Sequence, residues 1–167
     1  MTRKTTAHRR IKHTYTLFDV MCASPIEPLP EPKRRHQLTR MYGGLAAIEK
    51  GAAPTPDDWA VLSDCVNLME TLVLSGIVAD ADGLVMDGIA ALAMAGRRAV
   101  KGGQIRLDGP GIAAMRAVLE DYAALLEVLP ARTVIDCHRK TERRLREIMK
   151  GKRAAHDVEI IQAGAMA

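Results

Sequence analysis

Apolar residues recur every three or four positions in five stretches of this chain, which is the spacing that forms one face of an α-helix. The clearest helix start is Thr55-Pro56-Asp57-Asp58, where a capping threonine and a proline precede two carboxylates that suit the positive end of the helix dipole. Connections of a few residues between such helices favour antiparallel neighbours. The pattern therefore predicts an all-α fold, a compact bundle of four to five amphipathic helices. The predicted helices cover about residues 33–50, 55–76, 82–101, 108–130 and 131–150.

The apolar faces of these helices form the predicted core, and glycines interrupt two of them. Gly43 and Gly44 weaken the middle of the first helix by about 1 kcal/mol each relative to alanine. In the third helix Gly88 and Gly96 leave parts of the surface almost bare of side chain, where a neighbouring element can approach closely. The residues expected to face the core are Leu38, Met41, Leu45, Ile48, Trp59, Leu62, Cys65, Val66, Leu68, Met69, Leu72, Val73, Val85, Ile89, Leu92, Gly96, Val100, Ile112, Met115, Leu119, Tyr122 and Leu126.

The first 32 residues lack this period, and we predict that they form a basic arm followed by a proline-rich linker. The stretch from Ser24 to Pro32 contains four prolines, each of which removes a backbone donor and disfavours helix in the residue before it. We expect this stretch to be extended, as a linker or as a strap over the surface. The predicted organisation is an arm and linker over 1–32, a helical domain over 33–153 and a short C-terminal tail over 154–167.

Composition narrows the class of protein. Only 3% of the residues are aromatic, whereas Ala, Leu and Met are plentiful, and this bias favours helices over a β-sandwich. Cys22, Cys65 and Cys137 are far apart, which predicts neither a disulfide framework nor a zinc site and fits a reducing cytoplasm. No apolar run approaches the roughly 18 residues that span a membrane, and the basic N-terminus lacks the apolar stretch of a signal peptide. We therefore expect a cytoplasmic protein without a membrane partner.

Charge is distributed unevenly along the chain, although the net charge is only +4. Residues 1–40 hold 9 basic and 3 acidic side chains, residues 41–131 hold 6 and 12, and residues 132–167 hold 9 and 5. Two basic ends thus flank an acidic body. Such asymmetry concerns partners and solubility rather than fold, and it makes an acidic partner such as nucleic acid a candidate.

The most basic segment is CHRKTERRLREIMKGKR, residues 137–153, in which eight of seventeen side chains are Lys or Arg. On a helical wheel, five cations of the last helix share a narrow strip at about 100° to 160° from Leu145. Lys140 and Arg144 extend the positive face on the other flank. The five cations are Arg132, Arg139, Arg143, Arg146 and Lys150. The core stripe of the same helix comprises Val134, His138, Thr141, Ile148 and Met149.

Three interpretations of these five cations remain open. In the first, the cations form the solvated face of a helix, stabilised by the i,i+4 pairs Asp136–Lys140 and Glu142–Arg146 and by the negative C-terminal end of the helix dipole. In the second, they form a surface for successive phosphates, because each contacted phosphate releases counterions and adds affinity without sequence preference. In the third, they form a docking site for an acidic protein.

A second basic cluster, Lys33-Arg34-Arg35-His36, lies at the start of the first long helix. Cations are unfavourable near the positive end of a helix dipole, so dipole compensation does not explain this cluster. The arm adds Arg9 and Arg10, either in a solubilising tail or in a tail that lies along nucleic acid. The predicted nucleic-acid-binding residues are therefore Arg132, Arg139, Arg143, Arg146, Lys150, Lys33, Arg34, Arg35, Arg9 and Arg10.

No motif predicts catalysis, a metal site or a cofactor. Cys137 and His138 are adjacent, but neighbouring side chains diverge by about 100° on a helix, which argues against a nucleophile–base pair. His138 lies on the core stripe, and we expect a structural histidine there. The loop 102–111 lacks a phosphate-binding signature. Two interpretations of this loop remain: a functional loop from which Arg106 projects, or a simple connection between two helices.

Four stretches, PLPEPKRRHQLTRMYGGL, DDWAVLSDCVNLMETL, IRLDGPGIAAM and CHRKTERRLREI, lie between residues 25 and 146. This part of the chain resembles small helical proteins of unknown function that are encoded by prophages and related mobile elements of proteobacteria. The resemblance does not extend to residues 1–24. Because that group has no settled activity, the resemblance assigns no functional residue. It implies a bacteriophage gene product in the cytoplasm of a bacterial host, which acts by binding host or phage macromolecules.

The leading prediction is a non-catalytic accessory protein of a mobile element that binds nucleic acid or a nucleoprotein complex through its basic ends. In that role it regulates the element or inhibits a host defence system. The second hypothesis is a protein-only inhibitor or adaptor, which docks a host protein or self-associates as a homo-oligomer through its helical body. Electrostatic binding of nucleic acid collapses with added salt, whereas docking on an apolar surface does not, so salt dependence separates the two.

Overall fold

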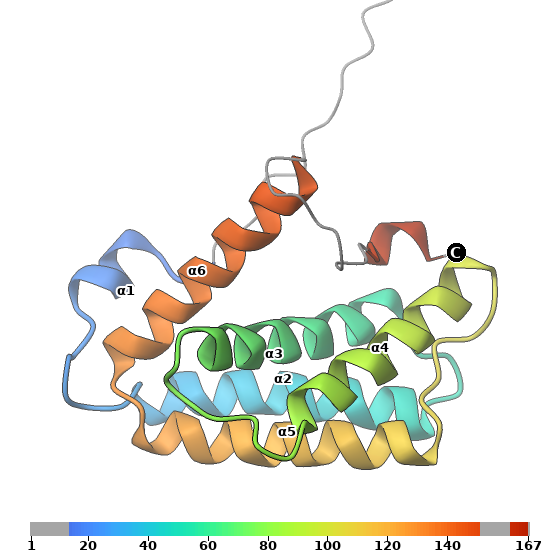
Figure 1. Ribbon diagram of the computed structural model, residues 1–167, viewed down its shortest axis with the longest axis horizontal. Helices are drawn as coiled ribbons and strands as arrows, with labels where there is room; N and C mark the ends of the chain where they lie inside the picture. Colours follow the sequence, from blue (N-terminus) through green and yellow to red (C-terminus); the bar gives the residue numbers. More distant parts are fainter. Residues whose placement is uncertain (1–13, 151–160, 167) are drawn as a thin grey trace, which may run out of the picture.

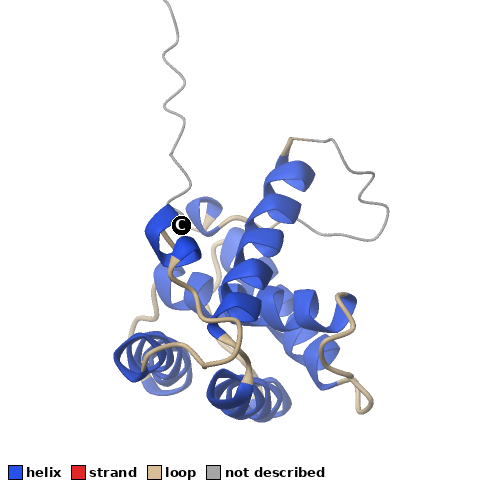
Figure 2. Ribbon diagram, turned by 90° about the vertical axis from the view of Figure 1, so that its left-hand side faces the viewer, coloured by secondary structure: helices blue, strands red, loops and turns tan. Residues whose placement is uncertain are grey.

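The computed structural model describes residues 14–150 and 161–166, and every regular element within these ranges is helical (Figure 1, Figure 2). The all-α prediction is confirmed, and the five long helices lie within a few residues of their expected bounds. A short helix precedes them and a 3-10 turn follows them. The elements are α1 (Leu17–Met21), α2 (Glu31–Lys50), α3 (Pro56–Leu74), α4 (Leu84–Val100), α5 (Gly109–Val128), α6 (Ala131–Met149) and η1 (Ala163–Ala165).

Helix α3 lies at the centre of the fold, in contact with α2, α4, α5, α6 and η1. Its start is the one that the sequence signals most clearly, and the capping interactions form. The side chain of Thr55 accepts the backbone N–H of Asp58 at 3.3 Å, and the Asp58 carboxylate accepts that of Thr55 at 2.8 Å. The preceding helix, α2, runs antiparallel to α3 in Figure 1, as a short connection predicts.

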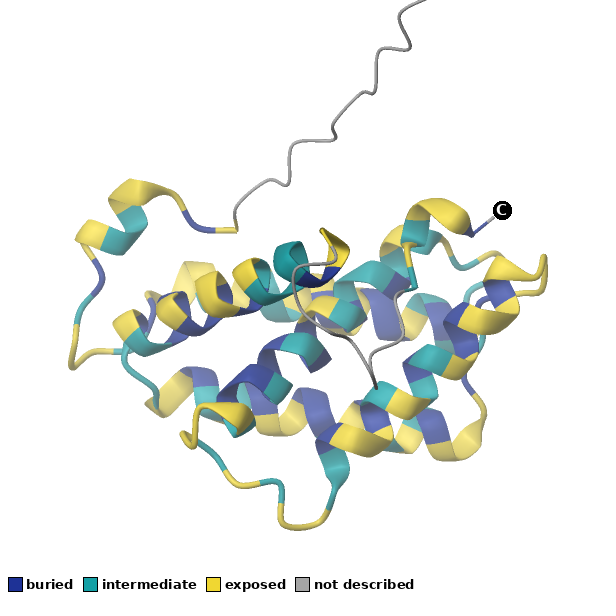
Figure 3. Ribbon diagram, turned by 45° about the horizontal axis from the view of Figure 1, so that its top comes forward, coloured by how far each residue is buried: buried dark blue, intermediate teal, exposed yellow. Residues whose placement is uncertain are grey.

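The predicted apolar stripes meet in one core, which is dark blue in Figure 3. Most of the residues expected there are buried or pack against it while partly buried. Two expectations are wrong, because Val100 is 46% exposed and Met149 is 55% exposed. Each is the final residue of its helix. There the apolar stripe runs past the neighbours that bury its earlier members.

The approach of α2 to the start of α3 depends on Gly44. A Cβ at this residue would lie 2.9 Å from the carbonyl oxygen of Asp58, which is closer than real Cβ contacts come. A Cβ at Gly43 would face open space, with no such atom within 4 Å. The sequence indicates only that both glycines weaken the helix. The structure shows that packing requires one of them and not the other.

We expect Gly44→Ala to lower the free energy of unfolding by about 1–3 kcal/mol, because the new methyl group overlaps a backbone atom that cannot rotate away. Gly43→Ala is the matched control, and we expect it to raise stability by up to about 1 kcal/mol through its higher helix propensity. Urea denaturation followed by circular dichroism measures both. Equal effects of the two substitutions would mean that α2 and α3 do not approach so closely.

The proline-rich stretch acts as a strap that caps the start of α6. This helix begins after Pro130, without a hydrogen bond from a capping side chain. The backbone N–H groups of Ala131 and Arg132 donate instead to the carbonyls of Glu27 and Ser24, at 2.8 and 2.9 Å. The first N–H groups of a helix have no partner within the helix. The strap therefore supplies hydrogen-bond acceptors for N–H groups that have no partner within α6.

Residues 14–30 pack on the helical body, within the stretch that the sequence assigns to an arm and linker. Tyr15, Ala23 and Leu29 are buried in the common core. The short helix α1 lies between the first two of them, and the sequence pattern does not predict it. Residues 1–13 of the predicted arm lie outside the described residues, as does much of the predicted C-terminal tail.

A buried polar network joins this N-terminal segment to three helices. The side-chain amide of Gln37 in α2 donates to the Tyr15 hydroxyl at 2.9 Å, and its nitrogen lies 3.4 Å from Nε2 of His138 in α6. The hydroxyl of Tyr122 in α5 donates to Oε1 of Gln37 at 3.5 Å. The rings of Tyr15 and His138 meet edge to face, with centroids 5.0 Å apart. His138 is thus a buried structural residue, as the core stripe predicts.

His138 and Asp64 titrate in the same pH range and change the stability of the fold in opposite directions. Burial lowers the pKa of His138 from 6.5 to about 4, with the Glu142 charge opposing this shift. Neutral His138 therefore contributes stability above the unfolded pKa, and this stability is lost as the pH falls between the two pKa values. The protein packed around Asp64 raises the pKa of its carboxyl to about 6, although the side chain reaches the surface and Arg40 opposes the shift. Ionised Asp64 therefore destabilises the fold as the pH rises through this range.

We expect the free energy of unfolding of Asp64→Asn, which lacks the opposing titration, to fall by about 2 kcal/mol between pH 7 and pH 4.5. Replacing His138 with Gln in the same background should remove most of that decrease, whatever it does to absolute stability. Urea denaturation at a series of pH values measures both slopes. An unchanged slope in the double variant would show that another group is responsible.

Candidate nucleic-acid interface

Helix α6 carries the largest group of predicted site residues, and its position leaves one side of it open. It packs on α3 and contacts α1. In Figure 1 it rises obliquely from one end of the body, away from α2 and α5. Its buried side contains Val134, His138 and Thr141, as predicted. The cations from Arg132 to Lys150 follow the other side over about 27 Å of helix axis.

The five predicted cations of α6, Arg132, Arg139, Arg143, Arg146 and Lys150, are called the cation strip below. All are exposed except Arg146, which is half-buried. The Arg132 guanidinium donates a long hydrogen bond of 3.4 Å to a backbone carbonyl beside α1. Within residues 14–150 and 161–166, none of the five forms an ion pair. Their charges are therefore available to a partner.

The i,i+4 ion pairs that would make this side self-compensating are not formed among the described residues. No salt bridge joins Asp136 to Lys140 or Glu142 to Arg146 there. The Glu142 carboxylate accepts the backbone N–H of Thr14 at 2.9 Å and so helps to hold the N-terminal segment. If the strip is only a solvated face, the helix dipole can still stabilise it, but these ion pairs do not.

Arg143 also lines a shallow hollow of about 330 Å³ where α6 passes the end of α3. Lys140 and Arg144 bring two further cations to this hollow, and Ser75 brings a hydroxyl. Glu147 and the carbonyls at the C-terminal end of α3 oppose an anion there. The hollow therefore adds Lys140 to the positive surface around Arg143 and does not form a separate anion site, because Arg144 is paired with Glu70. The sequence does not predict it, because it depends on where α6 crosses α3.

Arg144 has a structural role that its neighbour Arg143 lacks. Its guanidinium forms an ion pair with Glu70 of α3 and donates to the Asn67 carbonyl at 3.5 Å. Its side chain is only 15% exposed, whereas that of Arg143 belongs to an exposed residue. The pair joins α6 to α3 beside the hollow. Arg144 is therefore one of the residues that hold the strip in place.

The second predicted cluster, at the start of α2, is largely compensated within the protein. Lys33 forms an ion pair with Asp19 of α1, and Arg35 forms one with Glu31. Hydrogen bonds from Lys33 and from the capping threonine of α1 lower the pKa of the Asp19 carboxyl to about 2. Arg34 donates from Nη1 to a backbone carbonyl of the strap at 2.5 Å. Arg9 and Arg10 lie outside the described residues.

The other candidates from the sequence have structural surroundings. Arg106 donates to the carbonyls of Ile48 and Gly51, at 2.9 and 2.6 Å, and so closes the C-terminal end of α2. Burial raises the pKa of the Cys65 thiol to about 12, which keeps it protonated. The described residues contain no group of His, Cys, Asp and Glu that could hold a metal ion. None of their helices has the length and apolar character needed to cross a membrane.

Comparison with known proteins adds no family to this description. No protein-family model matches the chain, and no curated protein or solved structure matches it. The resemblance to prophage proteins therefore stays an expectation.

We expect Arg144→Gln to lower the free energy of unfolding by about 1–2 kcal/mol, because it leaves the partly buried carboxylate of Glu70 without its cation. Arg143→Gln is the matched control and should change stability by less than about 0.5 kcal/mol. Urea denaturation of the two variants measures the difference. If both were neutral, the ion pair with Glu70 would not hold α6 against α3.

Proposed function

We propose that this protein binds the phosphate backbone of nucleic acid, free or in a nucleoprotein complex, through the cation strip of α6. One observation carries the proposal: five cations share one side of a helix, and none of them forms an ion pair within the described chain. Their intervals of three, four and seven residues spread them along the helix axis, where they can reach successive phosphates. Contacts to phosphates position a protein without reading sequence. Binding is therefore expected to be salt-dependent and tolerant of sequence.

The cluster at the start of α2 contributes less than the sequence analysis expects. Lys33 and Arg35 already have carboxylate partners, so binding a phosphate through them would first break an ion pair. The strip on α6 carries no such cost. The interface that we propose is therefore centred on Arg139 and Arg143, with Arg9 and Arg10 as an additional contribution from the arm.

The wider role that we propose is that of a non-catalytic accessory protein of a bacteriophage or mobile element, in the cytoplasm of a bacterial host. It regulates the element or inhibits a host defence system by occupying a nucleic acid or nucleoprotein. The resemblance of residues 25–146 to prophage-encoded helical proteins supports this role. The all-α fold is consistent with this role, because it carries the cation strip on a packed helical body and the affinity would depend on those charges.

We expect the triple variant Arg139→Gln, Arg143→Gln and Arg146→Gln to bind a short DNA duplex more weakly and to lose up to about three units from the slope of log affinity against log salt. Its stability should change by about 1 kcal/mol or less, since these side chains point away from the core. Fluorescence anisotropy over a range of salt concentrations measures the slope for DNA and for single-stranded RNA.

A matched control removes the same charge elsewhere, with Arg40→Gln and Lys50→Gln at exposed positions of α2 and Lys101→Gln at the end of α4, none of which forms an ion pair among the described residues. A protein that begins at Thr14 removes the basic arm without cutting the packed N-terminal segment. If the strip variant and the control variant showed the same slope, net charge alone would explain binding. If the strip variant kept the wild-type slope, α6 would be only a solvated face.

A second candidate function is supported by the apolar side of α1. Leu17, Phe18 and Met21 are 71%, 72% and 72% exposed, although they belong to an ordered helix. Val20 packs on the core and fixes the helix with these three side chains outward. Exposed apolar side chains held in one place are typical of docking surfaces. A protein-only inhibitor or adaptor, or a homo-oligomer, would use this surface, and its affinity would persist at high salt.

A further inference from the structure

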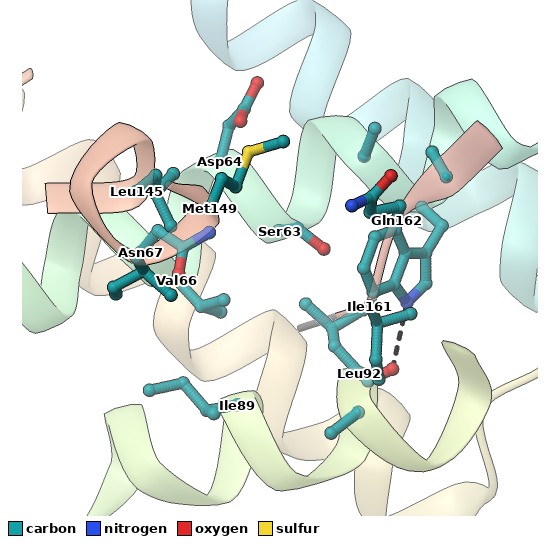
Figure 4. Close-up of a pocket in the computed structure, with 15 residues that line it drawn as sticks. Ser63, Asp64, Val66, Asn67, Ile89, Leu92, Leu145, Met149, Ile161 and Gln162 are labelled. Carbon is teal, nitrogen blue, oxygen red and sulfur yellow. Dashed lines mark hydrogen bonds between the residues drawn. The ribbon is translucent and has the colours of Figure 1, made fainter. Parts of the chain in front are cut away.

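A cavity of about 340 Å³ lies between α3, α4, the end of α6 and the segment at 161–163 (Figure 4). It faces the inner side of α6, whereas the cation strip is on the outer side. Its walls are mainly apolar and include Trp59, Leu92, Ile148 and Ile161. A space of this size is within the range of about 300–1,000 Å³ that is typical of small-molecule sites.

Two features fix the walls of this cavity. Gly96 lacks a side chain where the C-terminal segment returns, and a Cβ there would lie 2.8 Å from Cγ2 of Ile161. The bare surface that the sequence indicates on this helix is therefore covered by the chain itself. The indole N–H of Trp59 donates to the Leu92 carbonyl at 2.9 Å, which holds the ring as a wall and satisfies its only donor.

Four polar residues line the cavity: Ser63, Asp64 and Asn67 on α3, and Gln162 from the C-terminal segment. The hydroxyl oxygen of Ser63 is buried and has no hydrogen-bond partner in the described chain, and it points into the cavity (Figure 4). Asn67 lies one turn further along and presents its side-chain amide to the same space (Figure 4). A buried hydroxyl without a partner is unfavourable. A ligand with one polar group that both donates and accepts would remove that penalty.

The charge of the lining selects against an anion. Asp64 is the one ionisable residue among the described residues that line the cavity. Its pKa of about 6 leaves it mostly ionised at neutral pH. No described Lys, Arg or His lines the cavity, and Arg40, whose charge lowers the pKa of Asp64, lies outside the lining. The lining therefore favours a neutral molecule.

We propose that this cavity binds a small neutral molecule with an apolar body and one hydroxyl or amide group. The polar group lies against Ser63 and Asn67, and the body lies against Trp59 and the aliphatic walls. This site is independent of nucleic-acid binding, so either proposal can fail without the other.

Trp59 is the one tryptophan of the chain and lines the cavity, so its emission reports occupancy directly. The probes are 1-octanol and its anionic counterpart octanoate, titrated into the full chain at neutral pH. We expect a saturable change in Trp59 emission with 1-octanol. The affinity for octanoate should be lower by a factor of about ten or more, because the octanoate carboxylate would lie near Asp64 with no cation in the lining. Ser63→Ala should weaken 1-octanol binding about five- to tenfold, whereas the exposed control Ser75→Ala should leave it unchanged.

Two variants locate the probe. Ala93→Phe places a ring in the cavity from α4 and should abolish the response, whereas Ala90→Phe on the exposed side of the same helix should not. Ala163→Met fills the cavity from the C-terminal segment and leaves the helical body intact, so it decides the question if Ala93→Phe does not fold. The proposal fails if wild type shows no saturable response, if octanoate binds as well as 1-octanol, or if Ala163→Met binds with wild-type affinity.

Discussion

Helix α3 buries apolar side chains over more than half of its circumference, and this burial arranges the other long helices. Each of α2, α4, α5 and α6 finds a surface on it and therefore needs only one apolar face of its own. The sequence of α6 shows the consequence most clearly. Its buried residues lie on one side of the helix, so the cations of the strip can occupy the opposite side.

Two polar contacts act together with apolar packing to fix the direction of α6. Its first N–H groups are held by carbonyls of the strap, and further along Arg144 is held by Glu70. Because the helix is fixed near its start and beside the hollow, the cation strip has a defined orientation relative to the body. A strip on a rigid helix loses less conformational entropy on meeting phosphates than the same charges on a flexible tail would.

The parts of the fold that are local in sequence could be predicted, and the parts that depend on distant contacts could not. The capping residues at Thr55 and the three-to-four spacing of apolar residues locate the long helices without any tertiary information. Helix α1 is too short to show a period; a capping box of Thr16 and Asp19 starts it, and Val20 packs against the core. The sequence places Arg143 and Arg144 side by side in a basic run. Only the position of Glu70 on another helix makes one of them structural and leaves the other available. The cavity is beyond sequence reasoning for the same reason, because its last wall comes from residues 161–163.

The two proposed sites share the same segment of α6 and lie on different sides of it. Arg146 belongs to the outer strip, whereas Leu145 and Ile148 line the cavity on the inner side. Adjacent residues on a helix point about 100° apart, so the same segment can face a partner on one side and a ligand on the other. The end of α6 rests on α3 and not on a second layer of helices, which leaves the space beneath it unfilled. If the inner side of α6 were fully packed, this space would not exist. The cavity is thus a consequence of the same arrangement that exposes the strip, because the buried residues of α6 lie on one side of the helix only.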